Sequence, residues 1–317
     1  MAKARSKSNS NNFATIFLLA LVFSLTTAAC ALANSSLLFK EAQLVIGQGQ
    51  SQHMPMQESS LGIDYLNRLS GDSGDRALLA FQGRFVWNNG KNRIEPQIYN
   101  SYIKFKNPFT NLWLGHSQAS YGLNSYFDSH ALLLAPLGMT DFGFENDWGA
   151  GLLRDTNWGD IAISYTLGSG MSVQAEGNHL ASTRISFGVI NQRNFNIGLS
   201  KANGTLAQNI AVDFTGLDGA LLYENYELRV ENTSGAKSGL SYHSFLVRGG
   251  IKFLEEDRLK LELQQVNSEQ GTMSDQATFF GLTYIFDENL TFRLMGQSEA
   301  MAKDIKLTFQ GYFYTPW

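Results

Sequence analysis

The stretch "WGDIAISYTLG", residues 158–168, alternates apolar and polar side chains with a period of two residues. One set of alternate positions is Ile161, Ile163, Tyr165 and Leu167, and the other is Asp160, Ala162, Ser164 and Thr166. Successive side chains of a β-strand point to opposite faces, so the pattern predicts a strand with one apolar face. The same alternation recurs in "STRISFGVI" (182–190), "RLKLELQQV" (258–266) and "LTFRLMGQ" (290–297). The chain is therefore predicted to be all-β.

Applied to the whole chain, this criterion predicts sixteen strands. Their ranges are 37–49, 59–68, 78–88, 93–106, 110–118, 147–155, 158–168, 180–190, 195–202, 208–215, 220–232, 241–253, 258–267, 276–286, 290–299 and 305–314. The second and the tenth show the weakest alternation. Without such a pair the fold would have fourteen strands, which keeps the even number found in bacterial single-chain barrels.

The connections between these strands alternate in predicted length. Tight turns such as "GLDG" (216–219) and "DEN" (287–289) follow one set of strand ends. Longer links such as "ANGTLAQ" (202–208), "NTSGAKSG" (232–239) and "SEQGTMSDQ" (268–276) follow the other set. Short turns at one end and long loops at the other are typical of transmembrane antiparallel up-and-down barrels. A soluble β-sandwich, the alternative reading, gives no reason for such alternation.

The first 33 residues have the features of a secretory signal peptide. Lys3, Arg5 and Lys7 precede an apolar run at 13–25, and "ALAN" at 31–34 offers a small-residue cleavage site after Ala33. A membrane anchor is the alternative. "TAAC" at 27–30 also resembles a bacterial lipoprotein processing site, which would place a lipid on Cys30. We predict a cleaved signal peptide at 1–33 and an outer-membrane barrel at 34–317.

The charge balance and the cysteine count narrow the class of protein. Removing three basic residues from 24 leaves 21 Lys and Arg against 28 Asp and Glu, a net charge of −7 for the mature chain. This balance gives no electrostatic basis for binding nucleic acid. Cys30 is the only cysteine of the sequence, so an exported mature chain would contain no disulfide. These features fit the envelope of a Gram-negative bacterium.

In a membrane barrel the apolar face of each strand meets lipid and the polar face meets the lumen. Aromatic residues at predicted strand ends would form the interfacial girdles: Trp87, Trp113, Trp148, Trp158, Tyr284, Phe286, Phe313 and Trp317. Alternation assigns thirteen charged residues to the lumen as pore-lining candidates. They are Arg84, Asp160, Arg184, Asp213, Glu227, Arg229, Glu231, Arg248, Lys252, Lys260, Glu262, Arg293 and Lys306.

Eight of these thirteen residues are basic and five are acidic, which favours a water-filled passage with a weak preference for anions. The alternative is that they form salt bridges that brace a closed barrel. Segment 119–146 is too long and too apolar for an unstructured loop, so we expect it to fold inward and narrow the pore. Asp128, His130, Asp141 and Glu145 are the candidates for lining that constriction. A surface loop packed on its neighbours is the alternative.

The last stretch, "IKLTFQGYFYTPW" (305–317), places Phe309, Phe313 and Trp317 on one face of a strand. It resembles the C-terminal signal by which outer-membrane barrels are recognised for assembly. We therefore expect the barrel-assembly machinery to bind these aromatic residues, and we expect the last strand to pair with the first.

Several segments resemble one family of proteins. "NSYIKFKNPFTNLWLGHSQASYGLNSY" (100–126), "DWGAGL" (147–152), "WGDIAISYTLGSGM" (158–171) and "RISFGVINQRNFNIGLS" (184–200) are similar to the strand–turn–strand segments of phosphate-selective-type porins. The resemblance implies a sixteen-stranded barrel, a homotrimer, and an inward loop lined by basic residues.

No catalytic arrangement is evident in the sequence. The histidine of "GHSQ" (115–118) and that of "YHSF" (242–245) each precede a serine, but neighbouring residues of a strand face opposite sides. We expect no enzyme, no cofactor and no metal site. The predicted function is passive diffusion of small hydrophilic solutes or ions, with outer-membrane lipid and lipopolysaccharide as surroundings. The alternative is a non-conducting barrel that acts as an adhesin, an anchor or a sheath for a partner protein.

Overall fold

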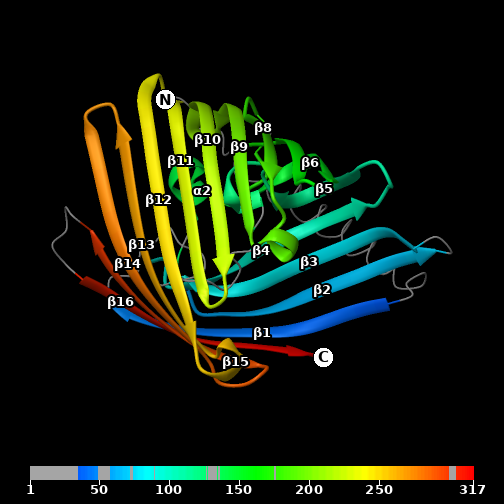
Figure 1. Ribbon diagram of the computed structural model, residues 1–317, viewed down its shortest axis with the longest axis vertical. Coiled ribbons are helices and arrows are strands. Elements are labelled where there is room, and N and C mark those ends of the chain that lie inside the picture. The colour runs from blue at the N-terminus through cyan, green and yellow to red at the C-terminus, as the bar shows by residue number, and fades with distance from the viewer. Residues whose placement is uncertain are drawn as a thin grey trace, which may run out of the picture.

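The structure is a computed structural model in which a β-barrel dominates (Figure 1). The residues that it describes are 35–48, 58–71, 74–88, 90–125, 127, 134, 136–174, 176–299 and 305–317. Within this part of the chain, sixteen antiparallel strands follow one another around a closed barrel. The predicted fold class is confirmed, with sixteen strands rather than fourteen. The predicted signal peptide and Cys30 lie outside the described residues.

The strands are long and nearly continuous. They are β1 (Ser35–Gln48), β2 (Ser60–Gly71), β3 (Gly74–Asn88), β4 (Arg93–Phe105), β5 (Asn111–Gln118), β6 (Asn146–Asp155), β7 (Asp160–Thr166), β8 (His179–Phe187), β9 (Phe195–Leu206), β10 (Ile210–Tyr223), β11 (Tyr226–Lys237), β12 (Leu240–Phe253), β13 (Leu259–Gln270), β14 (Met273–Ile285), β15 (Leu290–Glu299) and β16 (Ile305–Pro316). The short helices are η2 (Leu123–Ser125), α2 (Leu137–Phe142), α3 (Ile190–Arg193), η3 (Ala207–Asn209) and η4 (Glu255–Asp257).

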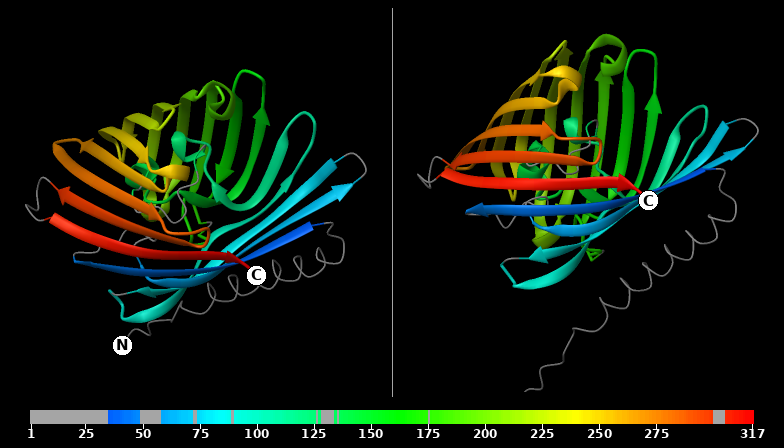
Figure 2. Two further views of the ribbon diagram at one scale, coloured as in Figure 1. Left: turned by 60° about the horizontal axis from the view of Figure 1, so that its bottom comes forward. Right: turned by 90° about the horizontal axis from the view of Figure 1, so that it is seen from below.

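The seam between the first and last strands closes the barrel. β1 pairs with β16 in antiparallel register, with Val45 opposite Gln310, and the two strands lie side by side in Figure 2. Beyond the end of β16, the Trp317 N–H donates to the Leu38 carbonyl oxygen at 2.8 Å. Closure satisfies the backbone groups of strands that would otherwise be edges, as a hydrocarbon environment requires.

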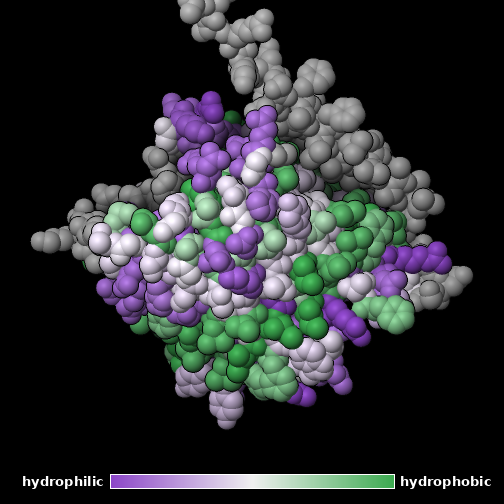
Figure 3. Space-filling view, turned by 90° about the horizontal axis from the view of Figure 1, so that it is seen from above, coloured by the Kyte–Doolittle hydropathy of each residue, from purple (hydrophilic) through white to green (hydrophobic). Residues whose placement is uncertain are grey.

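The wall is apolar outside and polar inside. In β9, Ile197 and Leu199 are 52% and 54% exposed, whereas Asn196 and Ser200 on the opposite face are 0% and 2% exposed. Seen from above, hydrophobic side chains gather in a band along one side of the barrel, with hydrophilic ones beyond it (Figure 3). Exposed apolar area of this extent is rare on soluble monomers and marks an interaction surface. No helix of the described residues is long and apolar enough to cross a membrane.

One predicted turn was wrong. "GLDG" (216–219) lies inside β10, and the true connection is the two residues 224 and 225 between β10 and β11. Gly216 is needed for a different reason, since a Cβ on it would lie 2.8 Å from Tyr121 Oη. Gly216 therefore allows another segment to approach the wall closely, a role that a local turn pattern does not distinguish from a turn.

Three predicted long links were also wrong, because most of their residues belong to strands. Stretches 202–208, 232–239 and 268–276 continue the ladder, and connections of two or three residues join β9 to β10, β11 to β12 and β13 to β14. Their outward side chains are polar, for example Asn203 and Ser234. Where a strand extends beyond the apolar band, its outward side chains are polar, so the sequence loses the apolar half of the alternation and resembles a loop.

Candidate functional site: the interior of the barrel

Segment 119–146, which joins β5 to β6, binds the inner face of the wall through its own backbone. The N–H of Ser120 donates to Ser164 Oγ at 2.9 Å, and the N–H of Gly122 donates to Ser200 Oγ at 3.0 Å. The N–H of Leu123 donates to Glu231 Oε2 at 3.1 Å. These three acceptors come from β7, β9 and β11. Inward-facing side chains of the wall therefore satisfy the backbone of the segment.

Gly122 is required for this contact. Its φ is +59°, and a Cβ built on it would lie 2.6 Å from Glu231 Oε2. Any larger residue would strain the backbone and push away the carboxylate that accepts from the next N–H. The glycine of "YGL" (121–123) is thus explained by the close contact with the wall.

A second anchor of the segment is Asp141 in α2, which is 1% exposed. Its carboxylate accepts hydrogen bonds from Ser244 Oγ at 2.6 Å, Thr233 Oγ1 at 2.7 Å and Tyr242 Oη at 3.0 Å. Burial raises the pKa of Asp141 above its usual range, although the three hydroxyl donors oppose that shift. The carboxylate is held by the wall of β11 and β12, so Asp141 positions the segment and does not face an open passage.

An apolar cluster fills the space between the segment and the wall. Phe142 packs on Phe214 with ring centroids 5.7 Å apart and on Tyr121 edge-to-face at 5.2 Å. The buried members are Ala119, Tyr121, Phe142, Leu180, Ala202, Leu206, Val212, Phe214 and Tyr242. A packed core of this kind excludes water from the side of the lumen along β8–β12.

A further contact lies on the opposite part of the wall, where Leu134 packs against Phe279 of β14 and Met295 of β15. Arg248 Nη2 donates to the Leu134 carbonyl oxygen at 3.1 Å. Near its end the segment meets β4, where Tyr99 Oη donates to Glu145 Oε2 at 3.4 Å. The described contacts of the segment therefore extend over much of the inner wall but fall outside β16, β1, β2 and β3.

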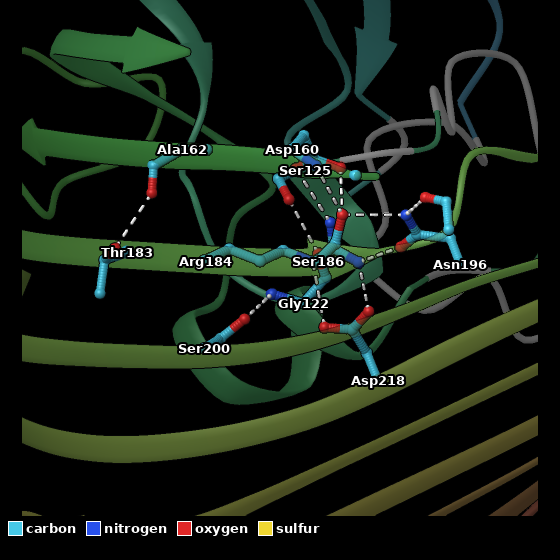
Figure 4. Close-up of polar contacts among 12 residues, drawn as sticks. Gly122, Ser125, Asp160, Ala162, Thr183, Arg184, Ser186, Asn196, Ser200 and Asp218 are labelled. Atoms are coloured by element: carbon cyan, nitrogen blue, oxygen red, sulfur yellow. Dashed lines mark hydrogen bonds and ion pairs between the residues drawn. The ribbon is translucent and has the colours of Figure 1, made fainter. Parts of the chain in front are cut away.

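Arg184 forms the most deeply buried charge network (Figure 4). It donates through Nε and Nη2 to the two carboxylate oxygens of Asp218, at 3.1 and 2.5 Å, and through Nη1 to Asp160 Oδ1 at 3.3 Å. Asn196 Oδ1 accepts a further bond from Nη2 at 2.5 Å. The Arg184 side chain is 0% exposed. A Cβ at Gly198 would lie 2.5 Å from its guanidinium, so the glycine provides the space that the guanidinium fills.

A second charge cluster lies on the inner faces of β11–β13. Lys260 Nζ is 2.8 Å from Glu227 and 2.9 Å from Glu262, and Arg229 also pairs with Glu227. Arg248 Nε donates to Gln264 Oε1 at 2.6 Å. Lys260 and Arg229 thus pair with the two carboxylates of this cluster.

The remaining lumen candidates have polar partners of their own, and Arg293 also lines a small cavity with Arg248 and Glu262 of the second cluster. Arg84 in β3 donates to Gln97, Arg293 in β15 donates to Gln310 Oε1 at 2.9 Å, and Lys252 pairs with Asp257 at the turn end. Lys306 faces inward on β16, as its buried neighbours at alternate positions show. Among the constriction candidates, Asp128 and His130 lie outside the described residues.

Asp213 was placed on the wrong face. It lies between buried Val212 and Phe214, is exposed on the outside of β10, and pairs there with Lys201 of β9. The assignment failed because the inner face at this height is apolar, where it packs on segment 119–146. Around Asp213 the inward side chains of β10 are therefore apolar and the outward ones polar, which is the reverse of the usual pattern.

Sequence reasoning missed several polar residues that hold the interior together. Asp218 was not assigned to the lumen because residues 216–219 were predicted to form a turn. Thr233 and Ser244 were missed because they carry no charge, and only charged residues were assigned to the lumen. Asp213 and Asp218 lie on opposite faces of β10, so a longer strand at 210–223 would have placed Asp218 inward only with the apolar residues Val212 and Phe214 assigned to the inner face.

Comparisons with known proteins show similarity of fold. No protein-family model matches the sequence, and no curated protein matches it. Among solved structures, OmpF of Salmonella typhi in complex with daunomycin has a TM-score of 0.70 at 11% identity, covering 89% of this chain and 98% of that one. The anion-selective porin from Comamonas acidovorans has a TM-score of 0.61 at 12% identity, covering 89% and 99%. The trimer form of OmpT from Vibrio cholerae has a TM-score of 0.59 at 10% identity, with the same coverage. The chain thus has the sixteen-stranded barrel fold of outer-membrane porins.

Proposed function

We propose that the protein is a porin of a Gram-negative outer membrane that allows small hydrophilic solutes or ions to diffuse passively. The observation that carries the proposal is the wall of the closed barrel, which is apolar on its outer face and charged on its inner face. Such a wall suits a hydrocarbon exterior and a polar lumen, and the similar solved structures support a channel.

We propose that the inward charges of the wall set the ion preference of the passage. Arg84 of β3 and Lys306 of β16 face inward together with Glu41 of β1 and Asp64 of β2, and Arg293 on β15 adds a further positive charge. Because positively and negatively charged side chains lie close together, the passage should discriminate only weakly between anions and cations. We expect a weak preference for anions. Segment 119–146 acts as the constriction in this proposal, with Glu145 as the described acidic residue that lines it.

The second candidate is a non-conducting barrel that serves as an adhesin, an anchor or a sheath for a partner protein. The tight polar packing of the interior favours it, since Gln264 and Gln310 are 1% and 0% exposed although they face inward. Single-channel recording in planar bilayers separates the two candidates. Ohmic steps from folded, inserted protein support the porin, whereas silence of such protein contradicts it and supports the second candidate.

Ion and solute selectivity are tested in the same assay. The reversal potential in a salt gradient measures the preference between anion and cation, and we expect a small shift toward the anion. The resemblance to phosphate-selective-type porins stays a prediction, which replacing chloride by phosphate tests directly. A homotrimer is expected, and native mass measurement of detergent-solubilised protein checks it.

Assembly into the membrane should depend on the C-terminal aromatic residues. Phe309 and Phe313 are each 40% exposed on the outside of β16, and Trp317 is 76% exposed. We expect deletion of Tyr314–Trp317 to impair insertion, because it removes Trp317 and shortens the seam with β1. Heat-modifiable mobility of membrane fractions measures insertion, and an unchanged folded band would contradict the expectation.

A further inference from the structure

A cavity of about 170 Å³ lies where three parts of the chain meet. Segment 119–146 contributes Met139 and Phe144 to its lining, β4 contributes Ile98, and the connection between β7 and β8 contributes Met171. Most of the accessible surface of the cavity belongs to apolar atoms. None of its described lining residues belongs to the two charge clusters, so the cavity is a separate feature of the interior.

The polar residues beside the cavity use their hydrogen-bonding groups within the protein. The Tyr99 carbonyl oxygen accepts from Asn146 Nδ2 at 2.6 Å and lies 2.9 Å from His116 Nδ1. The other polar atoms of these two side chains, Asn146 Oδ1 and His116 Nε2, are buried and have almost no accessible surface. Ser169 Oγ donates to the Ser172 carbonyl oxygen at 2.6 Å. A molecule in the cavity therefore meets few groups with which it could form hydrogen bonds.

Glu145 is the only Asp, Glu, Lys or Arg among the described residues that line the cavity. Its Oε2 accepts a hydrogen bond from Tyr99 Oη at 3.4 Å, so the carboxylate has a partner within the protein. The same carboxylate repels an anion. A charged guest would lose its hydration without gaining an equivalent partner, which is costly.

The start of β6 holds the connection between β7 and β8 in place at the cavity. The Asp147 carboxylate accepts from three successive backbone N–H groups, those of residues 168–170, at 2.5, 3.2 and 2.9 Å. Trp148 Nε1 donates to the Met171 carbonyl oxygen at 3.0 Å. Hydrogen bonds of the protein itself thus fix this side of the cavity, so the cavity is formed before a ligand binds.

The size and the lining of the cavity decide which molecule fits. One water needs about 10–15 Å³ of such volume, whereas an engineered apolar cavity of about 150 Å³ binds benzene. The thioethers of Met139 and Met171 make favourable contacts with aromatic rings. The ring of Phe144 offers a further surface for offset or edge-to-face packing. These features favour a neutral aromatic ring over an aliphatic or polar molecule.

We propose that this cavity is a binding site for a small neutral aromatic molecule of about the size of benzene. The ring contacts Met139 and Met171 and packs against Phe144. It thereby joins the end of segment 119–146 to the connection between β7 and β8 and makes both less mobile. This site does not depend on conduction, so it holds for an open porin and for a closed barrel.

The test is an NMR titration of the full-length folded protein in detergent, labelled with ¹³C at the methionine methyl groups. Met139 and Met171 report on the cavity, whereas Met273 and Met295 lie on β14 and β15 outside its described lining. Leucine substitutions assign the four signals. We expect benzene to shift the signals of Met139 and Met171 with one shared, saturable midpoint and to leave the other two unchanged. Absence of a shift at Met139 and Met171 would overturn the proposal, as would equal and unsaturable shifts of all four signals, which mark partition into the detergent.

Two further ligands test the chemical class at pH 7. Pyridine has the size and shape of benzene but carries a nitrogen that requires a hydrogen-bond donor, and benzylamine carries an ammonium group. We expect each to need at least a tenfold higher free concentration than benzene for half-saturation. Binding of pyridine or benzylamine as tight as that of benzene would show that polar groups of the protein reach the ligand, and would overturn the assignment to a neutral apolar ring.

One variant locates the site. Ile98→Phe places a ring in the cavity from the wall and should abolish the saturable shifts that benzene causes. The matched control is Ile197→Phe, because Ile197 is 52% exposed on the outside of β9 and its replacement should leave the shifts unchanged. Unchanged shifts in folded Ile98→Phe would refute the location. Where Ile98→Phe fails to fold, the titration of the parent protein still decides the proposal.

Hydrogen exchange measures the effect on mobility. At saturating benzene, exchange of the backbone amides of residues 143–146 and 168–171 should slow by at least twofold, whereas residues 240–253 of β12 should exchange as before. Unchanged exchange at both stretches in protein that binds benzene would refute the bracing of segment 119–146.

Discussion

Replacing Arg184 by Met should destabilise the folded barrel by about 3–5 kcal/mol, the usual cost of breaking a buried ion pair from one side. The Arg184 and Asp218 side chains are 0% and 1% exposed, and that of Asp160 is 12% exposed. The substitution keeps an unbranched stem and removes the guanidinium with its charge. It leaves two carboxylates near each other without a cation, and most of the cost arises at Asp218, the more buried of the two.

The free energy of unfolding can be measured by urea titration in lipid vesicles, followed by tryptophan fluorescence. The triple variant Arg184→Met, Asp160→Asn, Asp218→Asn should recover most of the loss, because no buried charge remains unpaired. The matched control is Lys201→Met, which breaks an ion pair with side chains 50% and 55% exposed on the outside of the barrel. An exposed pair contributes about 1 kcal/mol or less, so this control should unfold almost as the parent does.

The reasoning is refuted if Arg184→Met lowers the free energy of unfolding no more than Lys201→Met does. A small effect would mean that water reaches the guanidinium. In that case Arg184 would line an open passage, and Arg184→Met should shift the reversal potential toward cations. A large loss of stability with an unchanged reversal potential supports a structural role behind segment 119–146.

Three further predictions concern the segment and the passage. Gly122→Ala places a Cβ against the Glu231 carboxylate, so it should loosen the segment and raise single-channel conductance; an unchanged conductance contradicts the anchor. Burial raises the pKa of Asp141, so the folded segment binds a proton more tightly than the unfolded chain, whose pKa is near 3.8. Protection of residues 137–142 from hydrogen exchange should therefore be greatest below pH 3.8 and decrease as pH rises through the raised pKa. Asp141→Asn should remove that dependence, and a dependence of opposite sign would refute the assignment. Arg293→Gln should shift the reversal potential toward cations, whereas the same change at Lys201, outside the barrel, should not.

Much of the fold could be predicted because a barrel wall with an apolar outer band imposes a simple pattern on the sequence. Where a strand crosses the apolar band, alternation of the kind seen at 158–168 identifies both the strand and its inward residues. The prediction failed where the wall extends beyond the apolar band, as at 232–239, because polar residues on the outside remove the alternation. It also failed at Asp213, because the inner face there packs on apolar residues of segment 119–146.

The candidate site was less predictable than the wall. The charge of Glu231 was visible, but its use as an acceptor for the Leu123 N–H depends on where a segment more than a hundred residues earlier in the chain is placed. Asp141 was expected to line a constriction, and it is instead held by three hydroxyl groups of the wall. Uncharged partners such as Thr233 and Ser244 carry no signal in a single sequence.

The sequence by itself determined that the chain forms a closed membrane-type barrel, because period-two alternation and an even set of strands follow from local chemistry and from the need to pair every strand. The tertiary structure decided which inward charges pair with one another and which side of the lumen is filled by segment 119–146. Those outcomes depend on contacts between residues far apart in the chain. Their distances are set by the closure and register of the whole barrel, which no local pattern encodes.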